Sequence, residues 1–534
     1  MNGYIIALLI FVAWVGLVYY AHRIKWLERH SMSLFGPAVM WKTRRGRDFI
    51  DWLARPRRFW SLYGSLALWI CAGAMMTIML LLLWEATIVS QIAEPPSPEL
   101  ILGIPGVNPV IPIGYGILAL AISIVIHELS HGVLTRVGGM RVQSLGLLFL
   151  VFPVGAFVEP DEAELKGATR SRRTKVFAAG PASNIIAAML FLGLFSGVMM
   201  SSLEPERDGA LAVGVVADSP AALAGISPNS LIVSVGGVSI SNASELEARV
   251  AHTPGALTNV TYYRGGSLRT VEGVVDGVVV AFATKGFAAY ESGMRTGMVL
   301  VSLNDTPVGN VETLTQIMSR LRAGQTANVT VMSYDSTAQE FTVNPKIRTV
   351  TLSDKWEYYE RFYPDSNSES YRGVAYLGGG FLNLGFESAD ATYYRDILAK
   401  PFAGDRGLHD FSRSWLRLIA LPFLDLAPVR SPVTDLYHPA GSLAWMPDAL
   451  FWLVANSLYW IFWINLMLGL TNVLPMIPLD GGYVFSDAFG YVLGRIAPHA
   501  PKEKVERWAG QVVAALSLFV FGLILWQIVG PAVL

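Results

Sequence analysis

The chain has 534 residues, of which 53% are hydrophobic and only 15% are charged, against about 25% charged in soluble proteins, so composition points to a membrane protein. The 40 basic and 41 acidic residues nearly balance, which leaves no net positive charge to attract nucleic acid. The single cysteine, Cys71, excludes a disulfide framework and a cysteine-rich zinc module, so any metal must be held by histidines and carboxylates.

Six apolar stretches are long enough to cross a bilayer, whose roughly 30 Å of hydrocarbon takes about 20 helical residues. In chain order they are Tyr4–Tyr20, Trp60–Trp84, Ile111–Leu134, Val176–Met200, Phe451 to about Leu474, and Val512–Val529. The first lacks the basic start and the small-residue cleavage site of a signal peptide. The predicted fold class is a membrane α-helical protein of about six transmembrane helices, with an inserted extracytoplasmic α+β region.

Basic residues predict the orientation of these spans, because loops rich in Lys and Arg stay on the cytoplasmic side. Such residues gather between spans one and two, three and four, and five and six, whereas residues 85–110 contain none. We therefore expect both termini and the large insertion, residues 204–448, to be extracytoplasmic.

The third span ends in Ile126-His127-Glu128-Leu129-Ser130-His131-Gly132. Histidines four residues apart lie on one face of a helix, where two imidazoles can share a zinc ion at about 2.0–2.1 Å. Glu128 stands beside the first histidine, where it can accept a proton from a metal-bound water. Ionisable side chains within an apolar span usually mark function. The alternative is that the three lie at a helix end and only form hydrogen bonds.

Leu145–Val158 is apolar but too short to span, and it contains Pro153 and Gly155. We predict a re-entrant strand or hairpin that packs against protein, because irregular backbone is not tolerated in contact with lipid.

The insertion begins with two related stretches, Val213–Val238 and Tyr290–Val308, which precede the predicted helices Ser244–Val250 and Val311–Leu321. Both stretches resemble PDZ domains. The first has Pro228-Asn229-Ser230 in place of the usual Gly-Asp turn, and the second lacks the usual Ser-Pro-Ala start. The resemblance implies domains that either add a peptide strand beside an edge strand, or act as a steric filter for trimmed substrates, or serve as a spacer.

The rest of the insertion carries no recognised motif. Thr349–Arg413 is rich in aromatic residues and glycine, and we expect an additional β-element there. Trp415–Leu426 is expected to lie at the outer membrane interface. Three isolated histidines outside the spans, His252, His409 and His438, are expected to be structural or solvated.

A catalytic zinc site needs a third protein ligand and leaves the fourth position to water. The best candidate is Asp480, in the segment from Asn472 to Gly482 that reads NVLPMIPLDGG. This segment follows the fifth span on the membrane face predicted for His127. The alternative is a turn aspartate before two glycines.

Three motifs occur together: His-Glu-Leu-Ser-His in one span, Gly180-Pro181-Ala182-Ser183-Asn184 in the next, and Asn-x-x-Pro-x-x-Pro-Leu-Asp-Gly after a later one. In this order they resemble the site-2 protease family of intramembrane zinc metalloproteases, over roughly Ile111–Met200 and Phe451–Gly490. The resemblance implies that the predicted hairpin holds an unwound substrate by strand addition.

The resemblance also assigns roles to single residues. It implies that His127, His131 and Asp480 bind Zn²⁺ and that Glu128 is the catalytic base. Asn184 and Asn472 would contact the substrate backbone or stabilise the developing oxyanion. An interhelical hydrogen bond is the alternative for each of these two.

The predicted domains follow the chain. They are residues 1–110 with the first two helices and a basic loop, 111–200 with the catalytic membrane core, 204–280 and 281–346 with the PDZ-like domains, 347–448 with the extracytoplasmic extension, and 449–534 with the carboxy-terminal membrane core.

The sequence thus predicts a cell-membrane protease that cuts transmembrane protein substrates within the lipid bilayer or near it, from an active site towards the cytoplasmic side. The main alternative is a catalytically silent scaffold of the same family, although a scaffold needs no base between two ligands. A zinc transporter would need ligands that release metal on both sides. A membrane-anchored protease for soluble peptides would carry its ligands outside the spans.

Overall fold

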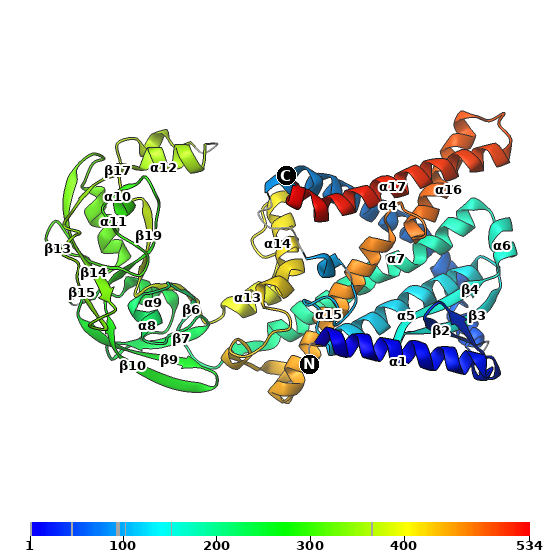
Figure 1. The fold of residues 1–534 in the computed structure, drawn as a ribbon, viewed down its shortest axis with the longest axis horizontal. Coiled ribbons are helices and arrows are strands. Elements are labelled where there is room, and N and C mark those ends of the chain that lie inside the picture. Colours follow the sequence, from blue (N-terminus) through cyan, green and yellow to red (C-terminus); the bar gives the residue numbers. More distant parts are fainter. Residues whose placement is uncertain are drawn as a thin grey trace. The chain divides into compact units, whose positions relative to one another are not determined.

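The computed structural model describes residues 3–43, 46–91, 97–101, 103–150, 152–251, 253–364 and 367–533. They form two compact units (Figure 1). The first unit comprises Met1–Val198, Gly404–Pro428 and Leu453–Leu534, and the second comprises Met199–Ala403 and Val429–Trp452. The predicted isolated histidine His252 lies outside the described residues.

Among the described residues, five helices are long and apolar enough to cross a membrane. They are α4 (Arg57–Ile88), α5 (Ile113–Val137), α7 (Arg170–Leu192, continued by π-helical turns to Met199), α15 (Asp448–Asn472) and α17 (Lys502–Val533). These helices correspond to the second to sixth predicted spans, with ends that differ by at most two residues from the predicted ones where they fall short. The first, Tyr4–Tyr20, lies within α1 (Gly3–Arg23), whose side chains are described only in part, so the count of six remains a prediction.

Small residues let α4, α5 and α7 approach closely. Ala67, Ala119, Ala178 and Ala182 are fully buried. This follows the rule that helices in membranes associate through small side chains and interhelical hydrogen bonds. A chain of hydroxyl groups links the three helices: Tyr63 on α4 bonds Ser183 on α7, which is 2.5 Å from Ser130 Oγ on α5.

The predicted hairpin is present as β3 (Val142–Leu150) and β4 (Phe152–Pro160), in which Leu145 pairs with Val158. The structure extends it with β1 (Met32–Phe35) and β2 (Ala38–Thr43), giving an antiparallel sheet in the order β1-β2-β3-β4. These two added strands were not predicted from the sequence. β4 is an edge strand of this sheet, and it packs beside α5.

The shorter helices of the first unit complete its packing. They are α2 (Trp26–Arg29), α3 (Arg47–Leu53), α6 (Glu162–Gly167), α14 (Leu408–Ala420) and α16 (Asp480–Ile496). α14 covers part of the segment predicted to be interfacial, and its carbonyl of Leu418 accepts a 2.7 Å hydrogen bond from the Tyr459 hydroxyl of α15. α16 packs on α7 and α17 and starts with Asp480.

The second unit contains the same supersecondary pattern twice. The first copy runs β6 (Ala210–Val215), α8 (Pro220–Leu223), β7 (Ser230–Val235), β8 (Val238–Ser239), α9 (Ala243–Ala248), β9 (Leu257–Arg264) and β10 (Ser267–Val275). The second copy runs β11 (Val278–Ala283), α10 (Ala288–Glu291), β12 (Val299–Leu303), β13 (Thr306–Pro307), α11 (Val311–Ser319), β14 (Thr326–Asp335) and β15 (Glu340–Val343). We call these copies the first and second repeat.

The two repeats also share a turn. Gly236 and Gly237 in the first repeat and Asn304 and Asp305 in the second all have positive φ. Two consecutive residues with positive φ are typical of the tight turns that join antiparallel strands. The related stretches noted in the sequence are therefore related in structure.

A later segment completes both sheets. β19 (Gly379–Asn383) pairs with β11 at the edge of the second repeat, and β20 (Phe386–Asp390) pairs with β6 at the edge of the first. The expectation of one additional β-element in Thr349–Arg413 is thus too simple, because its strands join the two existing sheets. The boundaries 204–280 and 281–346 likewise leave out these strands, and the second repeat begins at Val278 rather than at residue 281.

The remaining elements of the second unit are short. They are β16 (Thr349–Thr351), which pairs with β14, β17 (Ser353–Asp354), α12 (Lys355–Phe362), β18 (Ala375–Tyr376), α13 (Tyr393–Ala399), and β5 (Leu203–Pro205) paired with β21 (Tyr437–Pro439).

The two other histidines predicted to be isolated, His409 and His438, each lie beside one carboxylate, of Asp410 and Glu206 respectively. Within the described residues, neither belongs to a group of three metal-binding side chains.

Candidate metal centre

Two segments far apart in the sequence converge at one point of the first unit. His127 Nε2 lies 3.0 Å from Asp480 Oδ2, and His131 Nε2 lies 3.2 Å from the same oxygen. The two imidazole Nε2 atoms are 3.1 Å apart. α5 supplies both histidines one helical turn apart, and α16 supplies the aspartate at its first residue.

This donor set fits a tetrahedral zinc ion. With bonds of about 2.0–2.1 Å, the ligand atoms of such a site lie roughly 3.3 Å apart, close to the three separations observed. His131 Nδ1 lies 2.7 Å from the Val176 carbonyl oxygen. Because a carbonyl only accepts, Nδ1 must carry the proton, which leaves the lone pair of Nε2 directed at the shared point.

Gly180 of α7 makes room for the two imidazoles. A Cβ at this position would lie 2.4 Å from His131 Nε2 and 2.7 Å from His127 Nε2. Such contacts are too short for non-bonded atoms, so glycine is required here. The Gly180 backbone therefore forms one wall of the site.

Two glycines shape the turn that presents Asp480. A Cβ at Gly481 would lie 2.2 Å from the Val473 carbonyl oxygen, and one at Gly482 would lie 2.7 Å from the backbone of Met476. The chain after α15 thus folds back on itself so closely that only glycine fits after the aspartate.

The structure also holds Glu128 in a defined position. Its Oε2 accepts a 3.0 Å hydrogen bond from the backbone N–H of Val158 on β4. Residues 156 and 160 share this side of the strand, because backbone groups alternate along an antiparallel pair. The candidate base is therefore bound to the free edge of the four-stranded sheet.

The two predicted asparagines differ in their surroundings. Asn184 on α7 is fully buried, and among the described residues neither its Oδ1 nor its Nδ2 has a hydrogen-bond partner. Asn472 is half-buried and donates from Nδ2 to the Leu468 carbonyl of its own helix, at 3.1 Å. In the part of the chain that the structure describes, neither asparagine forms a hydrogen bond to another helix.

Polar contacts join the helix that carries Asp480 to α7. Arg173 forms a bidentate ion pair with the buried carboxylate of Asp487 on α16. Arg170 Nη1 donates to the Gly490 carbonyl at 2.8 Å. In the sequence, these arginines served only to predict which loops lie on the cytoplasmic side of the membrane. No local pattern indicated that they contact another helix.

The sequence indicated the three candidate ligands and the candidate base, but it did not indicate three features that the structure places around them. Gly180 lay inside a quoted motif without a role, and its close approach to the histidines depends on helix packing. The Val158 N–H and the Arg173–Asp487 pair connect residues that no local spacing relates.

A comparison with known proteins shows the family of the chain. The sequence model of peptidase family M50 matches residues 115–520, more than half of the chain and including both segments of the metal centre. An uncharacterized protein of Methanocaldococcus jannaschii is 33% identical over 162 residues, which are 29% of this chain and 42% of that protein. The chain thus matches less than half the length of that relative.

Proposed function

Because the chain belongs to peptidase family M50, which confirms the resemblance to site-2 proteases, we propose that it is an intramembrane zinc metalloprotease that cuts membrane proteins within or near their transmembrane segments. Membership implies a metalloprotease, and the apolar helices make it a membrane protein. The observation that carries the finer proposal is the convergence of His127 and His131, on a helix that can span a bilayer, with Asp480 at the start of α16.

Each residue of the centre has a proposed role. His127, His131 and Asp480 would hold zinc, which when bound supplies a Lewis acid and lowers the pKa of a water molecule towards about 7. Glu128 would accept a proton from the attacking water and return it to the leaving amine. The buried, unpartnered amide of Asn184 suits a contact with the substrate backbone or the developing oxyanion.

The substrate must be extended before it can be cut, because the amide and carbonyl of a helical peptide bond are already hydrogen-bonded and shielded. The free edge of β4 suits this need, since an extended segment can add to it as a further strand. The hydrogen bond from Val158 to Glu128 places the proposed base beside this edge.

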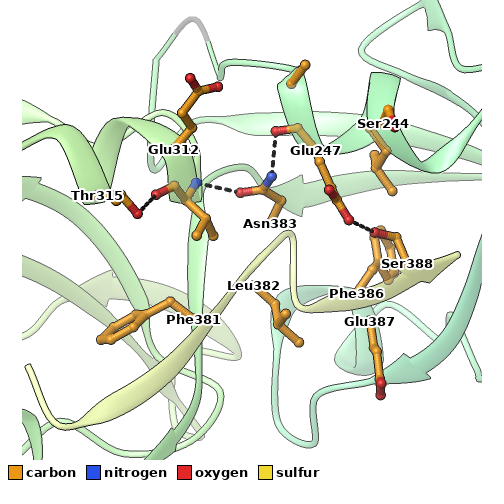
Figure 2. A pocket seen from close by; sticks show the side chains of 13 residues that line it. Ser244, Glu247, Glu312, Thr315, Phe381, Leu382, Asn383, Phe386, Glu387 and Ser388 are labelled. Carbon is orange, nitrogen blue, oxygen red and sulfur yellow. Dashed lines mark hydrogen bonds between the residues drawn. The ribbon is translucent and has the colours of Figure 1, made fainter. Parts of the chain in front are cut away.

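We further propose that the second unit lies outside the cytoplasm and controls access to the site. The two repeats support the PDZ-like interpretation, since in each a helix lies beside the edge strand that completes its sheet, α9 beside β20 and α11 beside β19 (Figure 2).

The test is the metal content of the detergent-purified protein beside the variants His127→Ala and Asp480→Ala. Near-stoichiometric zinc in the wild type and its loss in both variants would join the two segments in one site. Glu128→Gln should retain zinc yet fail to cut a membrane-embedded substrate. Zinc retained by Asp480→Ala would contradict the third ligand, and a folded wild type without zinc would favour a silent scaffold.

A further inference from the structure

An apolar cavity lies between α1 and the four-stranded sheet of the first unit, which are neighbours in Figure 1. Its volume is about 490 Å³, and ligand pockets in proteins usually measure about 300–1,000 Å³. The walls are apolar and aromatic side chains of α1, α2 and the strands β1, β2 and β3, among them Trp14, Ala21, Leu27, Val39 and Phe149. None of the described residues that line the cavity is charged. The cavity therefore suits a hydrocarbon group.

Contacts within the protein hold these walls in place. Val18, Leu27 and Val39 line the cavity and pack together as one buried cluster. Trp14 Nε1 donates a 2.9 Å hydrogen bond to the Pro37 carbonyl and so ties α1 to the turn between β1 and β2. Because the walls are already ordered, the protein loses little conformational entropy when a ligand enters the cavity.

The cavity is open on the side of α1 and α2. Leu17, Tyr20, Ile24 and Trp26 line it and are nevertheless exposed, Leu17 by 62%. Because α1 contains the predicted first span, we expect this opening to face lipid, whose hydrocarbon chains can enter it from the side. Tyr and Trp prefer the depth of the lipid headgroups in membrane proteins. Tyr20 and Trp26 therefore mark the headgroup level at one end of the cavity.

This end of the cavity, formed by residues 23–29, is basic. Arg23, Lys25 and Arg29 lie at the end of α1, in the turn that follows it and at the end of α2. All three are exposed, and in the part of the chain that the structure describes none of them forms an ion pair. Glu28 is the only acidic residue in the sequence from the start of α1 to the end of β2. A net positive charge thus lies where lipid headgroups are expected, and it can attract a phosphate.

We propose that this cavity binds an acyl chain of an anionic phospholipid, whose phosphate lies beside Arg23, Lys25 and Arg29. An empty apolar cavity forfeits dispersion contacts, so a hydrocarbon chain from the bilayer fills it. The basic residues favour an anionic headgroup over a neutral one, so the two halves of the site match one molecule. The inference needs only the membrane location that the apolar helices indicate, and it does not depend on the proposed protease chemistry.

The bound chain also contacts the sheet that carries the proposed base. Val39 on β2 pairs with Phe149 on β3, and both line the cavity. β3 pairs in turn with β4, whose Val158 N–H binds Glu128. A lipid chain that packs on β2 and β3 should therefore stabilise the sheet and raise the unfolding temperature of the first unit, which scanning calorimetry measures.

The experiment is native mass spectrometry of the delipidated full-length protein in detergent. The probes are phosphatidylglycerol and phosphatidylcholine with the same two acyl chains, and glycerol 3-phosphate, which has the phosphate but no chain. We expect one phosphatidylglycerol molecule to bind at least about tenfold more tightly than phosphatidylcholine, because three cations attract its net charge. Glycerol 3-phosphate should not bind over the same concentrations. Equal affinity for the two lipids, or for phosphatidylglycerol and glycerol 3-phosphate, would overturn the proposal.

One variant tests the cavity. Ala21→Trp fills the cavity with a side chain and should abolish the tight binding of phosphatidylglycerol. Gly16→Trp is the matched control, because it adds the same side chain to the same helix outside the lining, with no atom within 4 Å of the new Cβ, and it should leave binding unchanged. Tight binding that survives Ala21→Trp would mean that the lipid binds elsewhere, and the proposal would be wrong.

A second variant tests the charges and leaves the walls of the cavity intact. The triple variant Arg23→Gln, Lys25→Gln and Arg29→Gln should lower the affinity for phosphatidylglycerol to that for phosphatidylcholine. The matched control removes the same charge from three exposed positions next to the start of α4, as Arg55→Gln, Arg57→Gln and Arg58→Gln. This control should keep the preference for phosphatidylglycerol. An equal loss in both triple variants would indicate a general attraction to a basic surface and would contradict a defined site.

Discussion

At the scale of single residues, the candidate metal centre depends on the lack of a side chain at Gly180. A methyl group at Gly180 would collide with both imidazoles, so Gly180→Ala should lower zinc affinity by about 100-fold, the upper end for changes around metal ligands. Gly193→Ala is the matched control, because it lies at the end of the same helix with no atom within 4 Å of the new Cβ. Metal titration of chelator-treated protein checks this, and equal affinities in both variants would disprove the role of Gly180.

The backbone of Val158 gives a second prediction at this scale. Val158→Pro removes the N–H that binds Glu128, and edge strands tolerate proline. We expect kcat to fall by roughly tenfold or more, as for loss of positioning of a general base, with zinc content unchanged.

Ala156→Pro is the control for Val158→Pro, because it removes an N–H from the same edge without touching Glu128. This control should mainly raise KM, since it weakens strand addition. If both variants show the same change in kcat and KM, the Val158 N–H contributes to binding of the substrate strand and not to the position of Glu128.

At the scale of the elements, α16 must be docked against α7 for Asp480 to reach the histidines. The Arg173–Asp487 ion pair is a bidentate contact with a buried carboxylate at this interface. Breaking one partner of a buried pair costs about 3–5 kcal/mol. Arg173→Gln should therefore lower the melting temperature and the zinc content, whereas the exposed neighbour Arg172→Gln should change neither.

Thermal unfolding of the two arginine variants, with zinc analysis, makes this comparison. Adding Asp487→Asn to Arg173→Gln should restore part of the stability, since no unpaired charge then remains buried. A double variant as unstable as the sum of both single variants would contradict the pairing.

At the scale of the whole molecule, all three candidate metal ligands lie in the first unit. A ligand stabilises only the part that binds it. A chelator should therefore lower the unfolding transition of the first unit by several degrees and leave that of the second unit unchanged. Scanning calorimetry with and without chelator measures both transitions, and the response should be absent in His127→Ala. A chelator-sensitive transition in the second unit would point to a further metal site there.

The sequence by itself determined the features that depend on residues close together in the chain. His127 and His131 share a face because a helix turns every 3.6 residues, and five of the six apolar spans follow from length and composition. The repeat in the second unit could be recognised in the sequence because each copy contains its own strands and helix. Asp480 was identified as the candidate third ligand through its predicted membrane face and the family resemblance.

Only the tertiary structure showed which contacts form between segments that are far apart in the chain. β19 and β20 lie far along the chain from the sheets they complete, and strand pairing over such separations leaves no local pattern. Gly180, the Val158 N–H and Asp487 became meaningful only when their neighbours were known. The local sequence around a residue indicates which helix or strand the residue belongs to. The contacts of its side chain depend on how these elements pack, and packing depends on the whole chain.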